Sequence, residues 1–337
     1  MIRKAIRDIT EGRHLSESDA ELVMTEIMAG EATPAQIGSL LTGLRLRGET
    51  VKEVTGFVRA MRRCAVPFFT SRSVIDTCGT GGDMSGTFNV STVAAFVAAG
   101  AGLAVAKHGN RSVSSQCGSA DVLEAMGVDI ALLPERASVC LEQTGFAFLF
   151  AQRYHPAMKH AAAPRRELGI RTVFNIMGPL ANPAGAVAQV VGVYAPELTE
   201  FAASILANLG TERALVVHGE PRLDEISICG STRVTELGGG KIRTYMVTPE
   251  DFGLKRLKPK DIRGGDAAVN AAIALSVLAG EAGPARDLAL LNAGAALYVG
   301  GAAGDLREGV KLAAEVIDRG LAMACLKKVR RVSNELP

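Results

Sequence analysis

Helical signals fill the first 65 residues of the chain. In three places a Ser or Thr is followed three residues later by Glu or Gln, a pairing that caps the N-terminus of a helix. Gly30 and Gly48 follow the first two of the helices that these pairs predict and suit their C-terminal ends, and Pro34 suits the first position of the second helix. We therefore predict an all-helical N-terminal segment with the capping pairs Ser18/Glu21, Thr33/Gln36 and Thr50/Glu53.

The pattern changes at Val74, where short runs of β-branched residues begin to alternate with alanine-rich stretches. Residues 188–194 and 214–218 are typical strands of this kind, and residues 198–209 and 267–278 have the character of covering helices. Such alternation is typical of a parallel sheet covered on both faces. The chain is thus predicted to join a helical N-terminal part to a larger α/β part.

The most apolar stretch, residues 93–106, is too short to cross a membrane. It has 14 residues, two of them glycine, whereas a spanning helix needs about 20 apolar residues. We interpret this stretch as a buried helix followed by a strand, and we expect no membrane insertion.

Three polar clusters lie near the ends of the predicted strands. Gly79, Lys107 and His218 fall at the carboxyl ends of strands, and ligands of open α/β sheets bind at that edge. Glycine lets several backbone amides approach an anion closely, and a helix N-terminus adds further donors. A strand-to-helix turn, an N-cap and an exposed lysine are the plainer explanations of each cluster taken alone. Together the clusters predict a phosphorylated substrate; they are residues 79–83 (GTGGD), 87–92 (TFNVST) and 107–115 (KHGNRSVSS).

Asp224 and Glu225 are adjacent carboxylates that follow a predicted strand. Hard oxygen ligands of this kind bind Mg²⁺ and leave water and substrate phosphate to complete its octahedron. A surface turn is the plainer interpretation of an isolated Asp-Glu pair.

Further motifs follow in order along the chain. They are residues 165–169 (RRELG), 175–183 (NIMGPLANP) and 218–225 (HGEPRLDE). With the three polar clusters they resemble the anthranilate phosphoribosyltransferases, which join anthranilate to phosphoribosyl pyrophosphate in tryptophan biosynthesis, and the resemblance spans nearly the whole chain. One position departs from the family pattern: Arg222 stands where the family commonly has glycine, which leaves the geometry of the Asp224 turn open.

The resemblance implies a division into two domains. Residues 1–68, joined by a helical segment near 160–180, would form a small helical domain. Residues 69–337 would form a larger α/β domain that has a mostly parallel central sheet and binds phosphoribosyl pyrophosphate, with a cleft between the two, as in the nucleoside phosphorylase and phosphoribosyltransferase class. As in the family's dimers, the helical domain would form a homodimer, and we expect its apolar residues Ile27, Leu40, Leu41 and Leu44 to contribute to the interface.

The resemblance also implies the donor site. Magnesium would be held near the pyrophosphate by Asp224, Glu225 and the hydroxyl of Ser91. The residues that would bind phosphoribosyl pyrophosphate are Gly79, Gly82, Asp83, Thr87, Asn89, Val90, Ser91, Thr92, Lys107, His108, Gly109, Asn110, Arg111, Ser112, Val113, Ser114, Ser115 and Ser119.

On the acceptor side, Arg165 matches the family's anthranilate-binding arginine. A guanidinium can bind the acceptor's carboxylate in a bidentate manner that a lysine does not reproduce. The other residues expected at anthranilate are Gly79, His108, Asn110, Tyr154, His155, Met158 and Gly178.

The reaction that the resemblance implies is attack of the anthranilate amine on ribose C1 as pyrophosphate leaves. Fixed cations, amides and Mg²⁺ would carry most of the catalysis. We assign no general base, because an aromatic amine is barely protonated at neutral pH and its own ortho carboxylate can assist proton loss.

Composition bounds the setting. The 337 residues are 48% hydrophobic, which is enough for two domains, and the formal net charge of +2 gives no field that would attract nucleic acid. Six cysteines without a Cys-x-x-Cys pair are expected to be reduced thiols of a cytoplasmic protein. Asp8 and Glu11 interrupt the N-terminus before any long apolar run, so we expect no export signal there.

Two other functions stay open from the residues. A pyrimidine nucleoside phosphorylase shares this architecture but cleaves nucleosides with phosphate, and it would not need Asp224, Glu225 or Arg165. A catalytically silent relative that binds nucleic acid through a basic surface would lose affinity steeply as salt rises.

Overall fold

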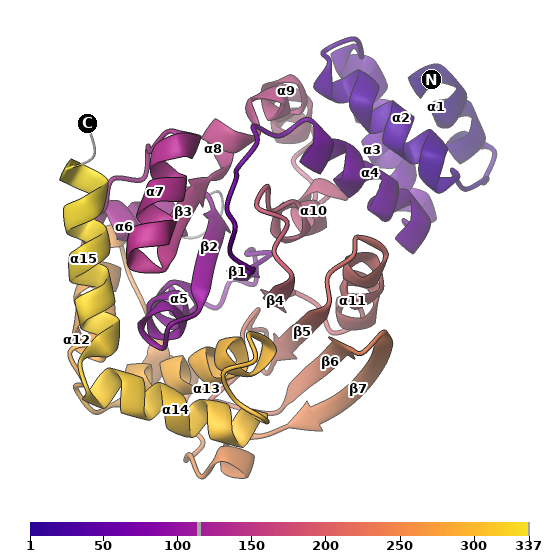
Figure 1. Ribbon diagram of the computed structural model, residues 1–337. Helices are drawn as coiled ribbons and strands as arrows, with labels where there is room; N and C mark the ends of the chain where they lie inside the picture. The colour runs from indigo at the N-terminus through magenta and orange to yellow at the C-terminus, as the bar shows by residue number, and fades with distance from the viewer. Residues whose placement is uncertain (113–115, 336–337) are drawn as a thin grey trace.

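Four helices at the N-terminus form a bundle. The computed structural model describes residues 1–112 and 116–335, and the bundle lies at the upper right of Figure 1. The structure confirms the capping boxes at Thr33 and Thr50. The box predicted at Ser18 is wrong, because the Ser16 hydroxyl accepts the Asp19 N–H at 3.0 Å and the helix begins at Glu17 instead. The helices are α1 (Ile2–Thr10), α2 (Glu17–Met28), α3 (Pro34–Arg47) and α4 (Val51–Arg63).

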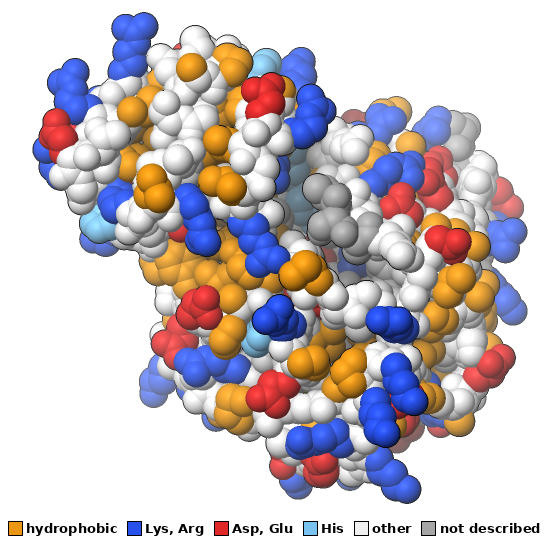
Figure 2. Space-filling view, turned by 180° about the vertical axis from the view of Figure 1, so that it is seen from behind, with side chains coloured by type: hydrophobic (Ala, Val, Ile, Leu, Met, Phe, Trp, Pro, Cys, Tyr) orange, Lys and Arg blue, Asp and Glu red, His pale blue; other side chains and the backbone are white. Residues whose placement is uncertain are grey.

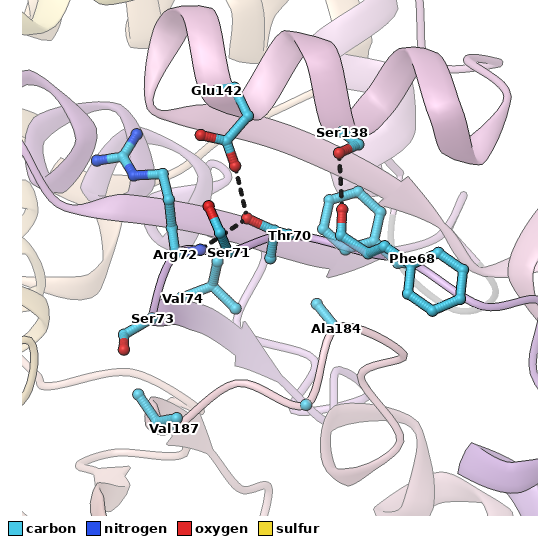
Figure 3. A pocket seen from close by; sticks show the side chains of 12 residues that line it. Phe68, Thr70, Ser71, Arg72, Ser73, Val74, Ser138, Glu142, Ala184 and Val187 are labelled. Atoms are coloured by element: carbon cyan, nitrogen blue, oxygen red, sulfur yellow. Dashed lines mark hydrogen bonds between the residues drawn. The ribbon is translucent and has the colours of Figure 1, made fainter.

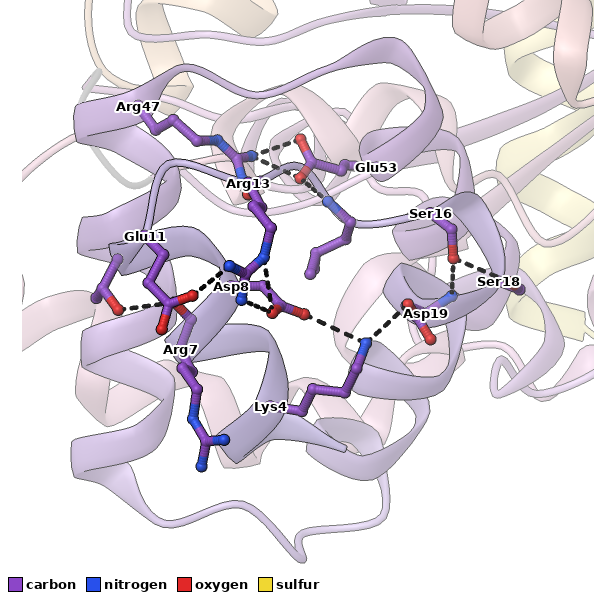
Figure 4. Close-up of polar contacts among 12 residues, drawn as sticks. Lys4, Arg7, Asp8, Glu11, Arg13, Ser16, Ser18, Asp19, Arg47 and Glu53 are labelled. Atoms are coloured by element: carbon purple, nitrogen blue, oxygen red, sulfur yellow. Dashed lines mark hydrogen bonds and ion pairs between the residues drawn. The ribbon is translucent and has the colours of Figure 1, made fainter.

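A buried carboxylate, Glu53, ties the bundle together (Figure 4). It accepts hydrogen bonds from the backbone N–H groups of Leu15 at 2.8 Å and Thr50 at 2.9 Å, and from the Arg47 guanidinium at 2.5 Å. Burial by itself raises the pKa of Glu53, but these donors outweigh burial and leave the pKa below its usual 4.5. The charge of Glu53 is therefore fully compensated inside the bundle.

The apolar residues that we expected at a dimer interface lie inside the subunit instead. Ile27, Leu40, Leu41 and Leu44 are each at most 1% exposed in the core of the bundle. Their helical spacing serves the packing of the bundle, so these four residues are not available to a second subunit.

A sheet of seven strands forms the centre of the larger part, in the order β3-β2-β1-β4-β5-β6-β7. The strands from β3 to β5 are parallel, as predicted, and β6 and β7 complete one side as an antiparallel hairpin. The bounds are β1 (Val74–Gly79), β2 (Ala104–Gly109), β3 (Phe146–Phe150), β4 (Ala188–Gly192), β5 (Arg213–Gly219), β6 (Thr232–Gly238) and β7 (Lys241–Val247).

Helices cover the sheet and bury its apolar strands. On one side α5 packs against α13 and α15, and α13 packs against α14. On the other side α11 contacts β5, β6 and α4, so it also touches the bundle. The covering helices are α5 (Val90–Gly100), α6 (Ser119–Ala125), α7 (Pro134–Thr144), α11 (Leu198–Asn208), α12 (Ala267–Leu278), α13 (Pro284–Val299), α14 (Leu306–Asp318) and α15 (Leu321–Glu335).

The chain returns to the bundle after β3. Helix α9 packs on α2 and α3, and α10 packs on α4 (Figure 1). This return follows α8 (Ala151–Tyr154) and the short turn η1 (Pro156–Met158), and consists of α9 (Lys159–Leu168) and α10 (Phe174–Leu180); two further turns are η2 (Pro249–Phe252) and η3 (Pro259–Ile262). Within the described residues, none of the helices has the length and apolarity needed to cross a membrane.

Candidate active site

The glycine-rich loop after β1 lies against the Asp224 turn. The Gly81 N–H donates to Asp224 Oδ2 at 2.7 Å. A Cβ on Gly79 would stand 2.4 Å from Asp224 Oδ2, and one on Gly192 would stand 1.5 Å from the Asp224 carbonyl oxygen. Both positions therefore require glycine for close approach, and Gly192 is a site residue that the sequence motifs did not indicate.

The departure at Arg222 leaves the turn unstrained. Among the described residues, Met84 is the single non-glycine residue with a positive φ, so Arg222 adopts an ordinary backbone conformation. Glycine is not needed at this position, and the arginine side chain is exposed.

Three acidic side chains meet at this loop. The Asp224 N–H donates to Asp83 Oδ2 at 3.4 Å, and the Ser91 N–H donates to Glu225 Oε1 at 3.2 Å. Burial raises the pKa of Asp224 to about 7, and the charge of Asp83 adds to the shift. Burial and the neighbouring Asp224 also raise the pKa of Glu225 well above its usual range. The turn thus concentrates acidic groups whose charge the protein compensates only in part.

These donors fit a magnesium ion that is only partly held by protein. Across residues 1–112 and 116–335, no three His, Cys, Asp or Glu side chains converge closely enough to form a complete metal cage. Magnesium usually takes one or two carboxylates and fills its remaining positions with water and substrate phosphate. Asp224 and Glu225, with the Ser91 hydroxyl nearby, match that donor set.

Lys107 lies beneath the site rather than on its surface. It is 1% exposed, and its ammonium donates to the Thr77 carbonyl and to the Ser91 hydroxyl at 3.2 Å. Burial lowers its pKa, while Asp76 and Glu225 act in the opposite direction. In this conformation the ammonium bonds protein oxygens, where the sequence predicted a direct grip on phosphate.

Asp76 is a buried acidic residue that the motif analysis missed. It is fully buried in β1 and accepts hydrogen bonds from the Asn182 amide at 2.7 Å and from the His108 N–H at 3.3 Å. Burial raises its pKa to about 6 in spite of nearby Lys107. The signal available in the sequence was an aspartate within the predicted strand that ends at Gly79.

Most of the other predicted donor residues lie on the same rim, but several are already engaged. Arg111 pairs with Asp121 at 2.8 Å and with Glu124 at 2.5 Å. The amide of Asn89 bonds the Cys117 carbonyl at 3.2 Å and accepts from Asn270 at 3.0 Å.

The remaining donor predictions divide by burial and by location. Val90 and Thr92 are buried. Gly109 is the last residue of β2 and Ser119 the first of α6, and the loop residues are Gly82, Thr87, Asn110 and Ser112. Val113, Ser114 and Ser115 lie outside the described residues.

On the acceptor side two histidines lie edge to face, with ring centroids 5.1 Å apart. Burial lowers the pKa of His108 to about 3 and that of His155 to about 4, so both rings are neutral at pH 7. Met158 in η1 and Gly178 in α10 are both half-buried. Tyr154 is fully buried against Phe68 in this structure, and its contact with the acceptor stays a prediction.

Arg165 is a cation without an acidic partner. Its guanidinium lies over the Phe174 ring, 4.8 Å from the centroid. Burial lowers its pKa, and no carboxylate among the described residues opposes that shift. A second arginine that the sequence analysis missed, Arg171, donates to the Gly82 carbonyl and stacks on Tyr194 at 4.3 Å. Arg171 thereby connects the acceptor segment to the glycine-rich loop.

Figure 2 shows a notch between the lobe of the N-terminal helices and the larger lobe. A second hollow, of about 830 Å³, lies at the opposite edge of the sheet, where the chain enters β1 at Val74 (Figure 3). There the Thr70 hydroxyl donates to Glu142 at 2.8 Å and the Ser138 hydroxyl donates to the Phe69 carbonyl. The polar groups of that hollow bond one another, whereas the strand-end site brings together the carboxylates of Asp83, Asp224 and Glu225.

Comparison with known proteins agrees with this geometry. Residues 3–65 match the helical bundle domain of a glycosyl transferase family, and residues 71–323 match its a/b domain. Anthranilate phosphoribosyltransferase of Moorella thermoacetica is 58% identical over 328 residues, which are 97% of this chain and 97% of that protein. The chain belongs to the anthranilate phosphoribosyltransferase family.

Solved structures of the family have the same fold. The enzyme of Thermus thermophilus superposes with a TM-score of 0.94 at 47% identity, over 98% of this chain and 99% of that one. The Saccharomyces cerevisiae enzyme in complex with PRPP and Mg gives a TM-score of 0.91 at 27% identity, over 99% of this chain and 98% of that one. The predicted fold class is confirmed, and the chain is a glycosyl transferase.

Proposed function

We propose that this enzyme transfers the 5-phosphoribosyl group of phosphoribosyl pyrophosphate to the amine of anthranilate, in tryptophan biosynthesis. The observation that carries the proposal is the opposition of charge across the site. The carboxylates of Asp224 and Glu225, whose charge the protein compensates only in part, suit a metal-bound pyrophosphate. The guanidinium of Arg165, which has no acidic partner among the described residues, suits a carboxylate acceptor. Neither a nucleoside phosphorylase nor a nucleic-acid-binding relative is supported by the comparisons.

The donor would lie on the glycine-rich loop. Backbone N–H groups at Gly79 to Asp83 and at the start of α5 would bind its phosphate oxygens. Val90 and Thr92 are buried, so their contribution would be through the backbone. Asn110, Ser112 and Ser119 would complete the shell from the segment between β2 and the start of α6. Val113, Ser114 and Ser115, predicted for the same shell, lie outside the described residues.

Magnesium would be held by Asp224, Glu225 and Ser91. When bound, the ion neutralises the developing charge of the leaving pyrophosphate. Lys107 supports this site from below, because its ammonium holds the Ser91 hydroxyl and offsets part of the charge of Glu225. The Gly81 amide fixes the Asp224 carboxylate in the same way.

Anthranilate would lie between the donor and the helical segment α9–α10. Arg165 would bind its carboxylate, with Asn110, Gly178, Met158 and the two neutral histidines around the ring. A neutral His108 neither repels a cationic transition state nor competes with Arg165 for the carboxylate.

The chemical step is attack of the amine nitrogen on ribose C1 while the bond from C1 to the pyrophosphate oxygen breaks. The amine then loses one proton, for which the acceptor's own carboxylate is suitably placed, so no protein base is required. The chain contributes by orienting both substrates and by excluding water from the oxocarbenium-like ribose.

We further infer a cytoplasmic homodimer with two domains in each subunit, residues 1–68 with the segment near 160–180, and residues 69–337. The packing of α9 and α10 on the bundle supports the division, and the free thiols at Cys64, Cys78, Cys140, Cys229 and Cys325 support a reducing compartment. For the dimer, Leu22 and Leu46 are large apolar side chains exposed on the bundle, 51% and 84% respectively.

The test is the loss of anthranilate fluorescence on mixing the enzyme with phosphoribosyl pyrophosphate, with and without Mg²⁺. We expect magnesium-dependent turnover that falls in Arg165→Ala through a higher KM for anthranilate. Arg166→Ala, the exposed neighbour on α9, is the matched control. Absence of turnover in the unmodified enzyme under every metal tested would refute the proposal.

A further inference from the structure

Three successive backbone carbonyls at the end of α10 are each bonded by a side chain. The Gln189 amide donates to Pro179 O at 3.2 Å, Arg62 Nε donates to Leu180 O at 2.9 Å, and His155 Nε2 lies 3.1 Å from Ala181 O. The preceding carbonyl, that of Gly178, accepts the backbone N–H of Ala181 at 3.2 Å. The last carbonyls of a helix have no partner within the helix, so these side chains fix the path of the turn. We call residues 178–181 the α10 turn.

Arg62 is the one among these three side chains that comes from the N-terminal bundle. The other two belong to β4 and to the segment after β3, both outside the bundle. The side chain of Arg62 leaves the last turn of α4 and reaches the Leu180 carbonyl across 118 positions of sequence. The α10 turn is therefore a point at which the bundle and the sheet are fastened to one another.

The environment of Arg62 is unusual for an arginine. Its Nη2 is buried and has no hydrogen-bond partner among the described residues. Burial lowers its pKa to about 10, and no nearby carboxylate counteracts that effect. A buried guanidinium without an acidic partner costs free energy of folding. Its neighbour Arg63, by contrast, is exposed and pairs with Glu21 at 2.5 Å.

The α10 turn begins at Gly178, which our proposed function places at the acceptor. The charge of Arg62 is also close enough to lower the pKa of His108. Arg62 thus acts on two neighbours of the acceptor without being one of the residues assigned to bind it.

We propose that Arg62 is a positioning residue for the acceptor, which holds the α10 turn in place through its hydrogen bond to Leu180. This inference rests on the proposed function. Without the bond, the turn loses its side-chain hydrogen bond to the bundle, and the wall at Gly178 no longer keeps its distance from Arg165 on α9. The donor loop, which is anchored on Asp224, does not depend on this bond.

The experiment compares steady-state constants of Arg62→Met, Arg62→Lys and the matched control Arg63→Met. For Arg62→Met we expect the KM for anthranilate to rise about tenfold, as for the loss of one charge-assisted hydrogen bond, with the KM for phosphoribosyl pyrophosphate within about twofold. Arg62→Lys is expected to recover part of the loss, and Arg63→Met to match the unmodified enzyme. Equal rises in both KM values, or no rise in either, would overturn the inference.

Two further measurements separate positioning from other roles. Ethylguanidinium added to Arg62→Ala at millimolar concentration should lower the KM for anthranilate, and ethylammonium should not; a purely structural defect would respond to neither. Competition by 2-aminobenzamide, which lacks the carboxylate, should weaken in Arg62→Met as much as binding of anthranilate does. Weakening confined to anthranilate would mean direct contact with the carboxylate and would replace the positioning role.

The outcomes also distinguish the two proposals. Absence of turnover in the unmodified enzyme rejects the proposed function, whereas normal turnover with unchanged constants in Arg62→Met rejects only the role of Arg62. If Arg62→Met does not fold, Arg62→Lys and the ethylguanidinium titration decide.

Discussion

Glu53 in the helical bundle and Asp76 in the sheet are equally buried, yet their surroundings treat the charge in opposite ways. Four nitrogen and oxygen donors converge on Glu53 and leave its pKa below its ordinary value. Asp76 receives two, and its pKa rises to about 6. The bundle compensates its charge for stability. The strand-end site instead keeps incompletely compensated groups of both signs, at Asp224 and at Arg165, where the proposed substrates would supply the partners. Perturbed groups of this kind mark functional sites.

The largest expected effect on activity comes from removing the carboxylates of the strand-end site. The double variant Asp224→Asn with Glu225→Gln should lower kcat/KM by about a thousandfold, because the pyrophosphate loses its metal site. The double variant should not lower the free energy of unfolding, because burial and the neighbouring acidic groups already disfavour the charged forms of both carboxylates. Turnover and urea unfolding measure the two effects. The control is Glu250→Gln, which removes an exposed carboxylate paired with Arg256. If the double variant failed to fold in the absence of Mg²⁺, the contrast between the bundle and the strand-end site would be contradicted.

Glu53→Ala should show the opposite profile. It removes the carboxylate that accepts from Arg47 and from the backbone N–H groups of Leu15 and Thr50, which costs about 4 kcal/mol of unfolding free energy. The kcat of the folded fraction should stay within about twofold, because the site lies outside the bundle core. Urea denaturation followed by circular dichroism measures the loss; stability equal to that of the unmodified enzyme would show that the network is dispensable.

The two buried carboxylates should give opposite pH dependences of stability. The pKa of Glu53 is depressed, so its contribution is present above pH 4.5 and is lost as pH falls below that value. The pKa of Asp76 is raised from 3.8 to about 6, so its contribution is present below pH 3.8 and about 3 kcal/mol is lost as pH rises through 6.

Unfolding midpoints between pH 3.5 and 8 test this pair. Relative to the unmodified enzyme, Asp76→Asn should gain stability as pH rises from 4 to 6. The stability of Glu53→Gln should approach that of the unmodified enzyme as pH falls below 4.5. Parallel curves for both variants would show that the difference between the two regions is not electrostatic.

A helix cap in the bundle should give the smallest effect. Thr33 accepts the Gln36 N–H through its hydroxyl at the start of α3, and Thr33→Ala should cost about 1 kcal/mol of unfolding free energy. Thr33→Ser keeps the hydroxyl and is the control. No change in either KM is expected, and a change in KM would mean that local events in the bundle reach the acceptor site.

The parts of the fold that sequence could predict depend on neighbours in the chain. Thr33 and Thr50 cap helices through residues three positions away. The strand β1 ends at Gly79, where the glycine-rich run of residues 79–83 begins. Ser18 failed because Ser16, two positions earlier, offers the same hydroxyl. The gathering of Gly79 and Asp224 followed from the rule that parallel strands present their ends at one edge.

What sequence did not predict depends on distant partners. Whether Lys107 reaches phosphate or the Thr77 carbonyl is decided by β1. Tyr154 at the end of α8 is a core residue because Phe68, in the segment between α4 and β1, packs on it. Arg62 and Asp76 carry no motif, and their roles arise from contacts with Leu180 and Asn182, more than a hundred positions away.

The packing of α9 and α10 on the first four helices has a consequence for synthesis on the ribosome. The bundle core includes Ala161, Phe174 and Met177 as well as residues of α1 to α4. The first 65 residues therefore leave the exit tunnel before the side chains that complete their core have been made. Until about residue 180 has emerged, the apolar faces of α3 and α4 lack part of their cover, so they are the surfaces that a chaperone would meet on the nascent chain.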